Sequence, residues 1–243
     1  MTPLEENLEQ LELAIHEACR AVGRSRESVQ LMAVSKTCPL ETLVEAASLG
    51  LALFGENRVQ EFQLKATHAA EFRRLSGKAH ARVHLIGHLQ SNKAAKAVEV
   101  FDGVDSLDSL KLAERLNEAA GKLGKQLPVL IEVKLSHEQS KAGLDPSSAE
   151  ACELLERLPD LAHLRVEGMM TIAPFGVSDE ATRDCFRQLR TLREGWANQH
   201  TRLSLDVLSM GMSGDFALAI AEGATRIRVG TVLFGRRSYG VQP

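Results

Sequence analysis

The sequence of 243 residues lacks an excess of either charge, a long apolar run and a leader-like amino terminus. Its 29 Lys and Arg against 32 Asp and Glu give a formal net charge of −3, so it carries no electrostatic signature of nucleic-acid binding. No apolar stretch approaches the roughly 18 residues of a membrane helix. The segment Met1–Gln10 carries acidic residues where a signal peptide would carry lysines and then an apolar run. We therefore expect a cytoplasmic protein that binds neither nucleic acid nor membranes.

Paired cysteines and linker-like segments are also missing. The four cysteines are widely separated and form no CxxC pair, which favours reduced thiols over a disulfide or a zinc site. No Gly/Ser-rich tract, Pro-rich tract, charge block or repeat interrupts the chain. Its 44% hydrophobic and 25% charged residues are typical of soluble globular proteins. We predict a single domain over residues 1–243.

The sequence does contain a regular alternation of short β-rich runs and longer stretches with helical periodicity. Several of the short runs are continuously apolar, as strands buried on both faces require. This alternation favours a parallel sheet. Eight strands are predicted, at Leu31–Ser35, Leu51–Gly55, Val83–Gly87, Phe101–Val104, Val129–Val133, Leu164–Met170, Leu205–Ser209 and Ile227–Val229.

Amphipathic segments that begin with helix-start residues lie between these runs. The predicted helices are Glu41–Leu49, Asn57–Arg73, Lys93–Val98, Leu110–Leu123, Glu150–Leu158, Glu180–Asn198 and Phe216–Glu222, and an extra helix, Leu4–Val22, precedes the first strand. Eight strand–helix units in a chain of this length indicate an α/β fold, a (β/α)8 TIM barrel with an additional N-terminal helix. A doubly wound open sheet is the alternative, because one sequence gives the strand number only to within one or two.

Active sites of such barrels lie at the carboxyl ends of the strands, so polar residues at those positions are candidates. The first strand ends Val34-Ser35-Lys36-Thr37, which puts a lysine at the mouth of the barrel. Partial burial there disfavours the ammonium form of Lys36 and leaves a free amine that can condense with a carbonyl. A surface lysine without a chemical role is the alternative.

The following strands also end in polar groups. Asn57 stands where the second strand meets a helix, and it either caps that helix or presents its amide to a ligand. His84 and His88 lie on a strand and its loop rather than on one helix face, which argues against a metal site and favours hydrogen bonding or ring stacking. After the fifth strand, Lys134 and the segment Ser140–Gly143 form a basic loop that could close over an anion.

The strongest local pattern follows the seventh and eighth strands. Ser209-Met210-Gly211-Met212-Ser213-Gly214-Asp215 leads into a helix, and small or hydroxyl residues at a helix start expose backbone N–H groups to an anion. The eighth strand ends Arg228-Val229-Gly230-Thr231. Barrels commonly bind phosphate with these two loops, so we expect a phosphate-bearing ligand. The alternative is that Ser213 only caps its helix and Gly230 only turns the chain.

Arg228 lies within the last strand, and a buried arginine needs an acceptor. In a closed barrel the first and last strands are neighbours, so Lys36 lies beside the predicted phosphate loops. A lysine next to a phosphate site suits a phosphorylated aldehyde that is held both covalently and electrostatically. Pyridoxal phosphate fits this description.

Six ordered motifs between about Leu4 and Tyr239 make the sequence resemble the pyridoxal phosphate homeostasis proteins, also called the YggS or PROSC family, single-domain relatives of the alanine racemase barrel. The motifs are Ala33-Val34-Ser35-Lys36-Thr37, Phe54-Gly55-Glu56-Asn57 with Val59-Gln60-Glu61, His84-Leu85-Ile86-Gly87 with Leu89-Gln90-Ser91-Asn92-Lys93, Ser140-Lys141-Ala142-Gly143, Ser209-Met210-Gly211-Met212-Ser213, and Arg228-Val229-Gly230-Thr231 with Phe234-Gly235.

The resemblance implies that pyridoxal phosphate forms a Schiff base with Lys36. The other residues implied to surround the cofactor are Asn57 and His84 beside it, Ser209, Gly230 and Thr231 on its phosphate, and Gly211 and Ser213 shaping the phosphate loop. Arg228 would face the pyridine nitrogen. Because an arginine keeps its proton, the ring would stay unprotonated and would be a poor electron sink.

Three positions depart from the family pattern. Lys134 stands where an asparagine is expected, Ala224 where serine is usual and His88 where proline is common. The first departure puts a ligand role for position 134 in doubt, and none of the three touches the implied cofactor site.

The resemblance implies a non-catalytic protein that binds pyridoxal phosphate, limits the free aldehyde and passes the cofactor to apoenzymes. A single barrel without an obvious exposed apolar tract favours a monomer. An amino-acid racemase that depends on pyridoxal phosphate is the alternative. Those relatives take a tyrosine from a second, β-rich domain, whereas Tyr239 is the one tyrosine of this chain. A third possibility is a phosphosugar-type barrel enzyme without a cofactor, in which Lys36 is a base or a structural residue.

Overall fold

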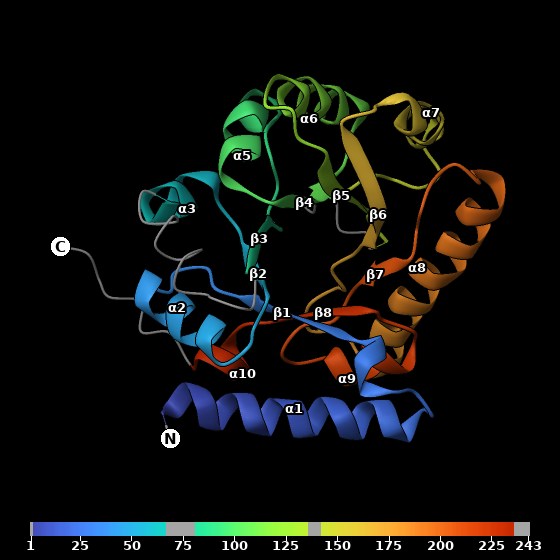
Figure 1. Cartoon of the computed structure of the whole chain (residues 1–243). Helices are drawn as coiled ribbons and strands as arrows, with labels where there is room; N and C mark the ends of the chain where they lie inside the picture. Colours follow the sequence, from blue (N-terminus) through green and yellow to red (C-terminus); the bar gives the residue numbers. More distant parts are fainter. Residues whose placement is uncertain (1, 67–80, 136–141, 236–243) are drawn as a thin grey trace.

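The computed structural model describes residues 2–66, 81–135 and 142–235, and its strands form a closed parallel barrel (Figure 1). The strands follow one another in chain order, and β8 pairs with β1 to close the barrel. This arrangement confirms the predicted (β/α)8 fold and rules out the open sheet. The strands are β1 Gln30–Val34, β2 Leu53–Glu56, β3 Arg82–Leu85, β4 Gly103–Leu107, β5 Leu127–Glu132, β6 Leu164–Met170, β7 Val207–Ser209 and β8 Arg226–Val229.

The fourth strand was predicted two to three residues too early, at Phe101–Val104. Phe101 instead precedes β4, is fully buried and stacks on Phe62 of the neighbouring helix, with ring centroids 5.1 Å apart. The strand continues through Asp105 and Ser106, which are buried inside the protein although their polarity suggested the end of the strand. The strand was predicted to end too early because Asp105 and Ser106 are polar, whereas in the structure both have hydrogen-bond partners inside the protein.

The helices surround the barrel, and serine hydroxyls start three of them: Ser109, Ser148 and Ser178 accept hydrogen bonds from the first turns of α6, α7 and α8. Helix α3 begins at Val59, so Asn57 precedes it, and the predicted continuation to Arg73 lies outside the described residues. The helices are α1 Pro3–Ala21, α2 Leu40–Ser48, α3 Val59–Ala66, α5 Ala94–Val100, α6 Leu110–Lys122, α7 Ala149–Arg157, α8 Asp179–Gln199, α9 Phe216–Ala221 and the unpredicted α10 Thr231–Phe234, with 3-10 turns η1 Arg26–Ser28, η3 Ser91–Lys93 and η4 Leu158–Asp160.

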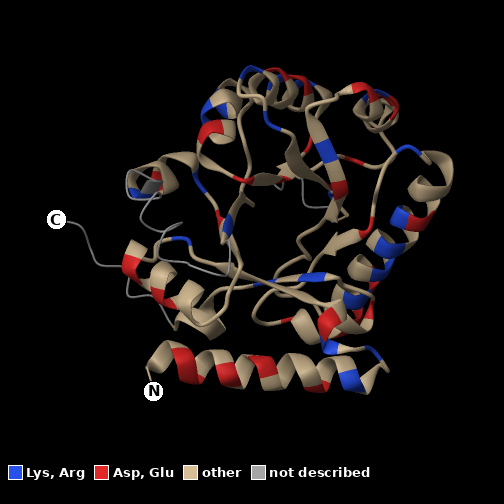
Figure 2. Cartoon of the chain, in the orientation of Figure 1, with Lys and Arg blue, Asp and Glu red and all other residues tan. Residues whose placement is uncertain are grey.

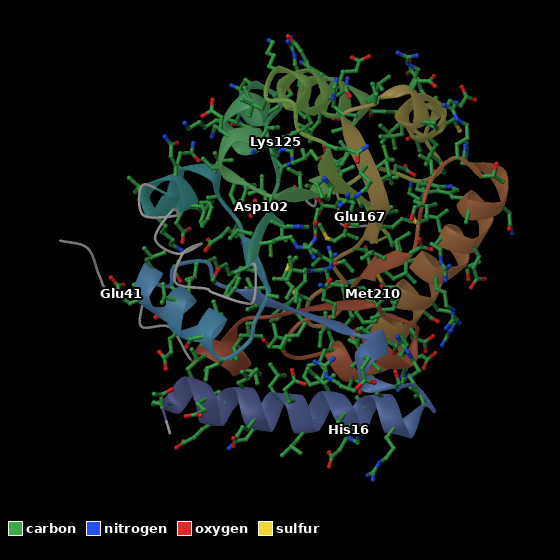
Figure 3. The ribbon with its side chains drawn as sticks, viewed as in Figure 1. His16, Glu41, Asp102, Lys125, Glu167 and Met210 are labelled. Carbon is green, nitrogen blue, oxygen red and sulfur yellow. The ribbon has the colours of Figure 1, made fainter. Side chains whose placement is uncertain are left out.

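Helix α1 is the predicted extra helix, and it packs against α9 and α10, the helices on either side of β8 (Figure 1). Thr2 and Glu5 form a capping box at its start. Leu11 and Ile15 are fully buried, whereas His16 is exposed and points away from the barrel (Figure 3). Acidic residues recur along α1 and basic residues along α8 (Figure 2). Within the described part of the chain, no helix has the length and apolarity to cross a membrane.

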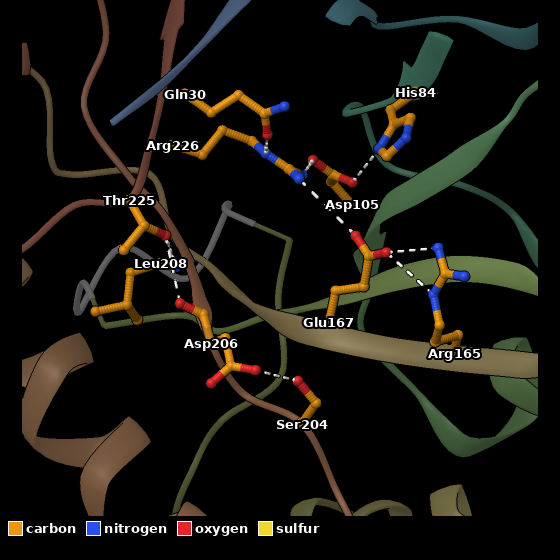
Figure 4. Close-up of polar contacts among 10 residues, drawn as sticks. All are labelled: Gln30, His84, Asp105, Arg165, Glu167, Ser204, Asp206, Leu208, Thr225 and Arg226. Carbon is orange, nitrogen blue, oxygen red and sulfur yellow. Dashed lines mark hydrogen bonds and ion pairs between the residues drawn. The ribbon is translucent and has the colours of Figure 1, made fainter. Parts of the chain in front are cut away.

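A network of ion pairs fills the barrel interior near the starts of β1 and β8 (Figure 4). Arg226 donates hydrogen bonds to Gln30 at 3.0 Å and to Asp105 at 2.9 Å. Asp105 Oδ1 lies 2.8 Å from His84 Nδ1, and Arg226 approaches Glu167 at 3.9 Å. Arg228 lies two residues further along β8, on the same face and closer to the carboxyl end of the barrel.

Candidate functional site

A cavity of about 530 Å³ opens at the carboxyl ends of the strands, within the size range of small-molecule sites. Its walls come from residues at the ends of strands or in the loops that follow them. The lining residues are Val34, Lys36, Asn57, Ile86, Gly87, His88, Glu132, Val133, Lys134, Ala142, Ile172, Phe175, Met212, Ser213, Gly214, Arg228, Gly230 and Thr231.

Two thirds of the predicted site residues meet at this cavity because β1 and β8 are paired. Lys36 follows β1, and Gly230 and Thr231 follow β8, so the lysine faces the same space as the predicted phosphate loop. Lys36 is half-buried and has no hydrogen bond to another described residue. The predicted residues that line the cavity are Lys36, Asn57, Ser213, Arg228, Gly230 and Thr231.

Two hydrogen bonds join the loop after β7 to the end of β8. The backbone N–H of Gly230 donates to the Ser213 hydroxyl at 3.4 Å, and the N–H of Arg228 donates to the Gly211 carbonyl at 2.9 Å. Gly211 has φ +92°, and a Cβ on it would lie 2.5 Å from the Cβ of Ala219 in α9. Gly211 therefore shapes the loop without lining the cavity, and Ser213 joins the two loops instead of capping a helix.

Arg228 is buried, and its guanidinium is fixed by acceptors at the end of β7 and directly after β6. It donates to the carbonyl of Ser209 at 2.7 Å, to the Ser209 hydroxyl at 2.9 Å and to the Thr171 carbonyl at 2.8 Å. Burial lowers the pKa of Arg228, while Asp105, Glu132 and Asp215 oppose this shift. Ser209 is fully buried beneath Arg228 and does not line the cavity. Direct contact of Ser209 with a phosphate stays a prediction.

The two candidate histidines lie in different environments. His84 is fully buried in the interior network with Asp105, not on the cavity wall, and a Cβ on Gly103 would lie 2.6 Å from its ring. His88 is about half exposed at the rim, where its Nδ1 lies 3.2 Å from Asp108. Over residues 2–66, 81–135 and 142–235, no cluster of three potential ligands is placed to hold a metal ion.

Glu132, which the sequence reasoning did not select, ends β5 on the cavity wall and is buried. Its Oε2 atom has no hydrogen-bond partner among the described residues. Burial raises the pKa of Glu132 to about 7, with a further contribution from Asp108, while Arg228 opposes the shift. A single acid within the apolar run Val129–Val133 was the signal in the sequence. Lys134 and His88 also line the cavity, so the prediction that neither touches the cofactor site is wrong. Ser140 and Lys141 of the predicted basic loop lie outside the described residues.

Residues 7–238 match the family model for the alanine racemase N-terminal domain. The chain is 42% identical over 240 residues to the pyridoxal phosphate homeostasis protein of Vibrio alginolyticus, covering 98% of this chain and 100% of the relative. It is 39% identical over 241 residues to the protein of the same name from Escherichia coli K12, covering 98% of this chain and 99% of that one.

Solved structures agree with these sequence matches. PipY of Synechococcus elongatus PCC7942, known without and with bound pyridoxal phosphate, is 43% identical, with TM-scores of 0.83 and 0.82 over 96% of this chain and 100% of PipY. An alanine racemase of Clostridium difficile 630 is 18% identical, with a TM-score of 0.67 over 98% of this chain and 57% of the racemase, and it shares the fold. The chain belongs to the family of pyridoxal phosphate homeostasis proteins, whose barrel matches the alanine racemase N-terminal domain.

Proposed function

We propose that this protein binds pyridoxal phosphate in the cavity at the carboxyl end of the barrel, through a Schiff base with Lys36 and without catalytic turnover. It acts in the cytoplasm as a monomer that limits the free aldehyde and releases the cofactor to apoenzymes. The observation that carries this proposal is the position of Lys36 on one cavity with Ser213, Gly230 and Thr231. The bound pyridoxal phosphate in PipY supports the same assignment.

The residues of the cavity fit the chemical groups of this cofactor. When bound, pyridoxal phosphate supplies an aldehyde that condenses with an amine and releases water. The amine of Lys36 is available, and the hydroxyls of Ser213 and Thr231 are donors suited to a phosphate. Glu132 contributes a carboxyl oxygen that no other described residue satisfies, as expected of a group that faces a ligand.

Arg228 supports the proposal that the cofactor is bound without turnover. Its guanidinium is held in place by Ser209 and Thr171, so it cannot swing away from the cavity. An arginine donates a hydrogen bond to a pyridine nitrogen but does not give up its proton, which leaves the ring a weak electron sink. Proton abstraction at the α-carbon of an amino acid is therefore disfavoured.

One observation favours the second candidate, an amino-acid racemase. Glu132 lines the cavity with a pKa raised to about 7 by burial, and a carboxyl of that kind can transfer protons near neutral pH. We rank this function second because a racemase also needs a ring that stabilises a carbanion. Incubation of the loaded protein with single enantiomers of amino acids tests it, and conversion that disappears in Glu132→Gln would favour the racemase.

The first experiment is a visible absorption spectrum of the protein with added pyridoxal phosphate, followed by borohydride reduction and peptide mapping. We expect a Schiff-base absorption band and a reduced adduct on the Lys36 peptide. Lys36→Ala should lose both, whereas Lys134→Ala, which removes the other lysine lining the described cavity, should keep both. A label on Lys134, or no label, contradicts the assignment of Lys36.

A further inference from the structure

The turn that carries Lys36 contains an unfavourable backbone conformation. Thr37 has φ +63°, and among the described residues no other non-glycine residue has a positive φ. This region disfavours side chains branched at Cβ, so such a residue stays there only when neighbouring groups hold it. The turn also contains a hydrogen bond from the Cys38 N–H to the Ser35 carbonyl at 3.0 Å. Lys36 thus lies between two constrained residues.

Three charged side chains, Glu56 at the end of β2 and Glu61 and Lys65 in α3, form hydrogen bonds with the residues on either side of Lys36. The Thr37 N–H donates to the carboxylate of Glu61 in α3. The ammonium of Lys65, one turn further along α3, lies 3.5 Å from Glu61 and 2.9 Å from Glu56.

The same cluster reaches the residue before Lys36. The Ser35 hydroxyl donates to Glu56 at 2.8 Å, and the Lys65 ammonium donates to the Ser35 carbonyl at 3.3 Å. The residues on both sides of Lys36 are therefore tied to one ionic cluster formed by Glu56, Glu61 and Lys65.

This cluster is unusual for a purely structural contact. Glu56 is fully buried, and its Oε2 atom has no partner among the described residues. Burial raises the pKa of Glu56, and the nearby Lys65 only partly offsets the shift. Apolar side chains of similar size would often fill such a position at no loss of stability. None of the three charged residues lines the cavity, so they do not contact a ligand there.

We propose that Glu56, Glu61 and Lys65 are positioning residues that fix the Ser35–Thr37 turn and so aim the Lys36 amine into the cavity. The proposal rests on the proposed function, in which Lys36 is the covalent anchor. Strand alternation explains the arrangement: Val34 lines the cavity, Ser35 faces α3 and Lys36 faces the cavity again. β1 ends at Val34, and the left-handed conformation of Thr37 turns the chain directly after Lys36. A fixed turn limits the orientations that the Lys36 side chain can adopt, so its amine is already directed at the cavity.

The test measures how fast the absorption band forms when pyridoxal phosphate is mixed with folded variants. Glu61→Ala removes the acceptor of the Thr37 N–H and should slow capture by about tenfold or more. Glu61→Gln keeps an acceptor oxygen and should stay within about threefold of wild type. Glu99→Gln, an exposed acid paired with Lys96, is the matched control and should not change the rate. Unfolding curves identify conditions in which every variant is fully folded.

A rescue experiment separates positioning from general stability. Glycine adopts a positive φ without support, so Thr37→Gly in the Glu61→Ala background should restore the capture rate to near the wild-type value. A merely structural role would leave the rate of the fully folded Glu61→Ala protein unchanged, and that result overturns the proposal, as does failure of the rescue. Lys65→Met, which loses the bonds to Ser35 and Glu56, is the second variant should Glu61→Ala not fold, and it too should slow capture.

The proposed function and this inference fail in different ways. Absence of the borohydride label on Lys36 in the wild-type protein contradicts the proposed function itself. A normal label on Lys36, combined with normal capture by folded Glu61→Ala and Lys65→Met, overturns only the positioning role.

Discussion

Glu132 ends a strand of six buried residues, yet its Oε2 atom has no partner among the described residues. Burial raises its pKa to about 7, Asp108 contributes in the same direction, and Arg228 keeps it from rising further. Near neutral pH both the protonated and the charged form of the carboxyl are therefore populated, so the group can donate or accept a hydrogen bond. A ligand in the cavity meets a group whose charge changes near physiological pH.

This residue gives stability a defined dependence on pH. The folded-state pKa of Glu132 lies above its ordinary value of 4.5, so between these pH values the folded protein binds a proton that the unfolded chain has lost. The contribution of Glu132 to stability consequently falls as pH rises from about 4.5 to about 7 and then levels off. Glutamine carries no charge, so Glu132→Gln lacks this fall.

We expect Glu132→Gln to be close to wild type in stability at about pH 4.5 and more stable by about 3 kcal/mol at about pH 8. Urea unfolding of the ligand-free proteins at both pH values measures the difference. Glu17→Gln, at an exposed position of α1, is the control and should give the same small difference at both. A difference for Glu132→Gln that does not change with pH would show that the carboxyl titrates normally.

Individual residues also show how far the sequence could predict the site. Lys36, Gly230 and Thr231 were predictable because they follow strands that any closed barrel makes neighbours. His84 was predicted to lie beside a ligand. Its actual partner, Asp105, lies in β4 beyond the predicted end of that strand, so nothing in the sequence pattern indicated the contact between them. The strain at Thr37 was not predictable either, because backbone conformation depends on the Glu61 contact from another element.

Among the structural elements, the loop from β7 to α9 depends most on close packing. Gly211 combines φ +92° with a position against α9, where an added Cβ would also lie 3.1 Å from the Cα of Phe216. Gly214 of the same loop has open space around it. Substitution of each glycine by alanine therefore distinguishes the need for close packing at Gly211 from a general need for a flexible loop.

Gly211→Ala should destabilise the protein by about 2 kcal/mol or more, because the new methyl group meets Ala219 and the backbone is strained. Gly214→Ala should change stability by no more than about 0.5 kcal/mol. Unfolding by urea measures both. Equal effects of the two substitutions would mean that α9 moves to accommodate the methyl group and that Gly211 does not fix the loop.

The order and type of the elements followed from periodicity, but their ends did not. Predicted β6, Leu164–Met170, has the observed bounds, since Leu164, Val166 and Gly168 are buried while Arg165 and Glu167 between them are more exposed, the alternation expected of a strand. Helix α10 was not predicted because four residues are too short for a helical period to appear. Where an element ends depends on partners such as Ser213 for Gly230, which a local pattern does not contain.

For the whole molecule, the network of His84, Asp105 and Arg226 connects β3, β4 and β8 through the barrel interior (Figure 4). Burial would raise the pKa of Asp105, but the contacts with His84 and Arg226 outweigh burial and lower it. The folded-state pKa is thus below the unfolded value, so this contribution to stability is present at neutral pH and is lost as the pH falls. The network links strands on different sides of the barrel.

Asp105→Asn should destabilise the whole barrel by about 3 to 5 kcal/mol at pH 7, because it removes the carboxylate that accepts a hydrogen bond from the buried Arg226 and leaves only the more distant Glu167. The deficit relative to wild type should shrink towards acid pH, where the wild type loses the same contribution. Asp160→Asn breaks only exposed pairs, with Arg202 and Arg157, and should cost less than about 1 kcal/mol. Chemical unfolding over a pH series tests this, and a loss no larger than that of Asp160→Asn would show that the network does not hold the strands together.

The sequence by itself determined the number and order of the strand–helix units, because hydrophobic periodicity is a local property. It also placed Lys36 after the first strand and Gly230 and Thr231 after the last, and the closure of a parallel barrel then brings Lys36 to the phosphate loops. The tertiary structure decided which polar residues face the cavity and which form hydrogen bonds with one another. Asp105, Glu56 and Ser209 are buried in contacts between different elements, while Glu132 lines the cavity. A buried polar group needs partners, and only the three-dimensional arrangement says which partners are within reach.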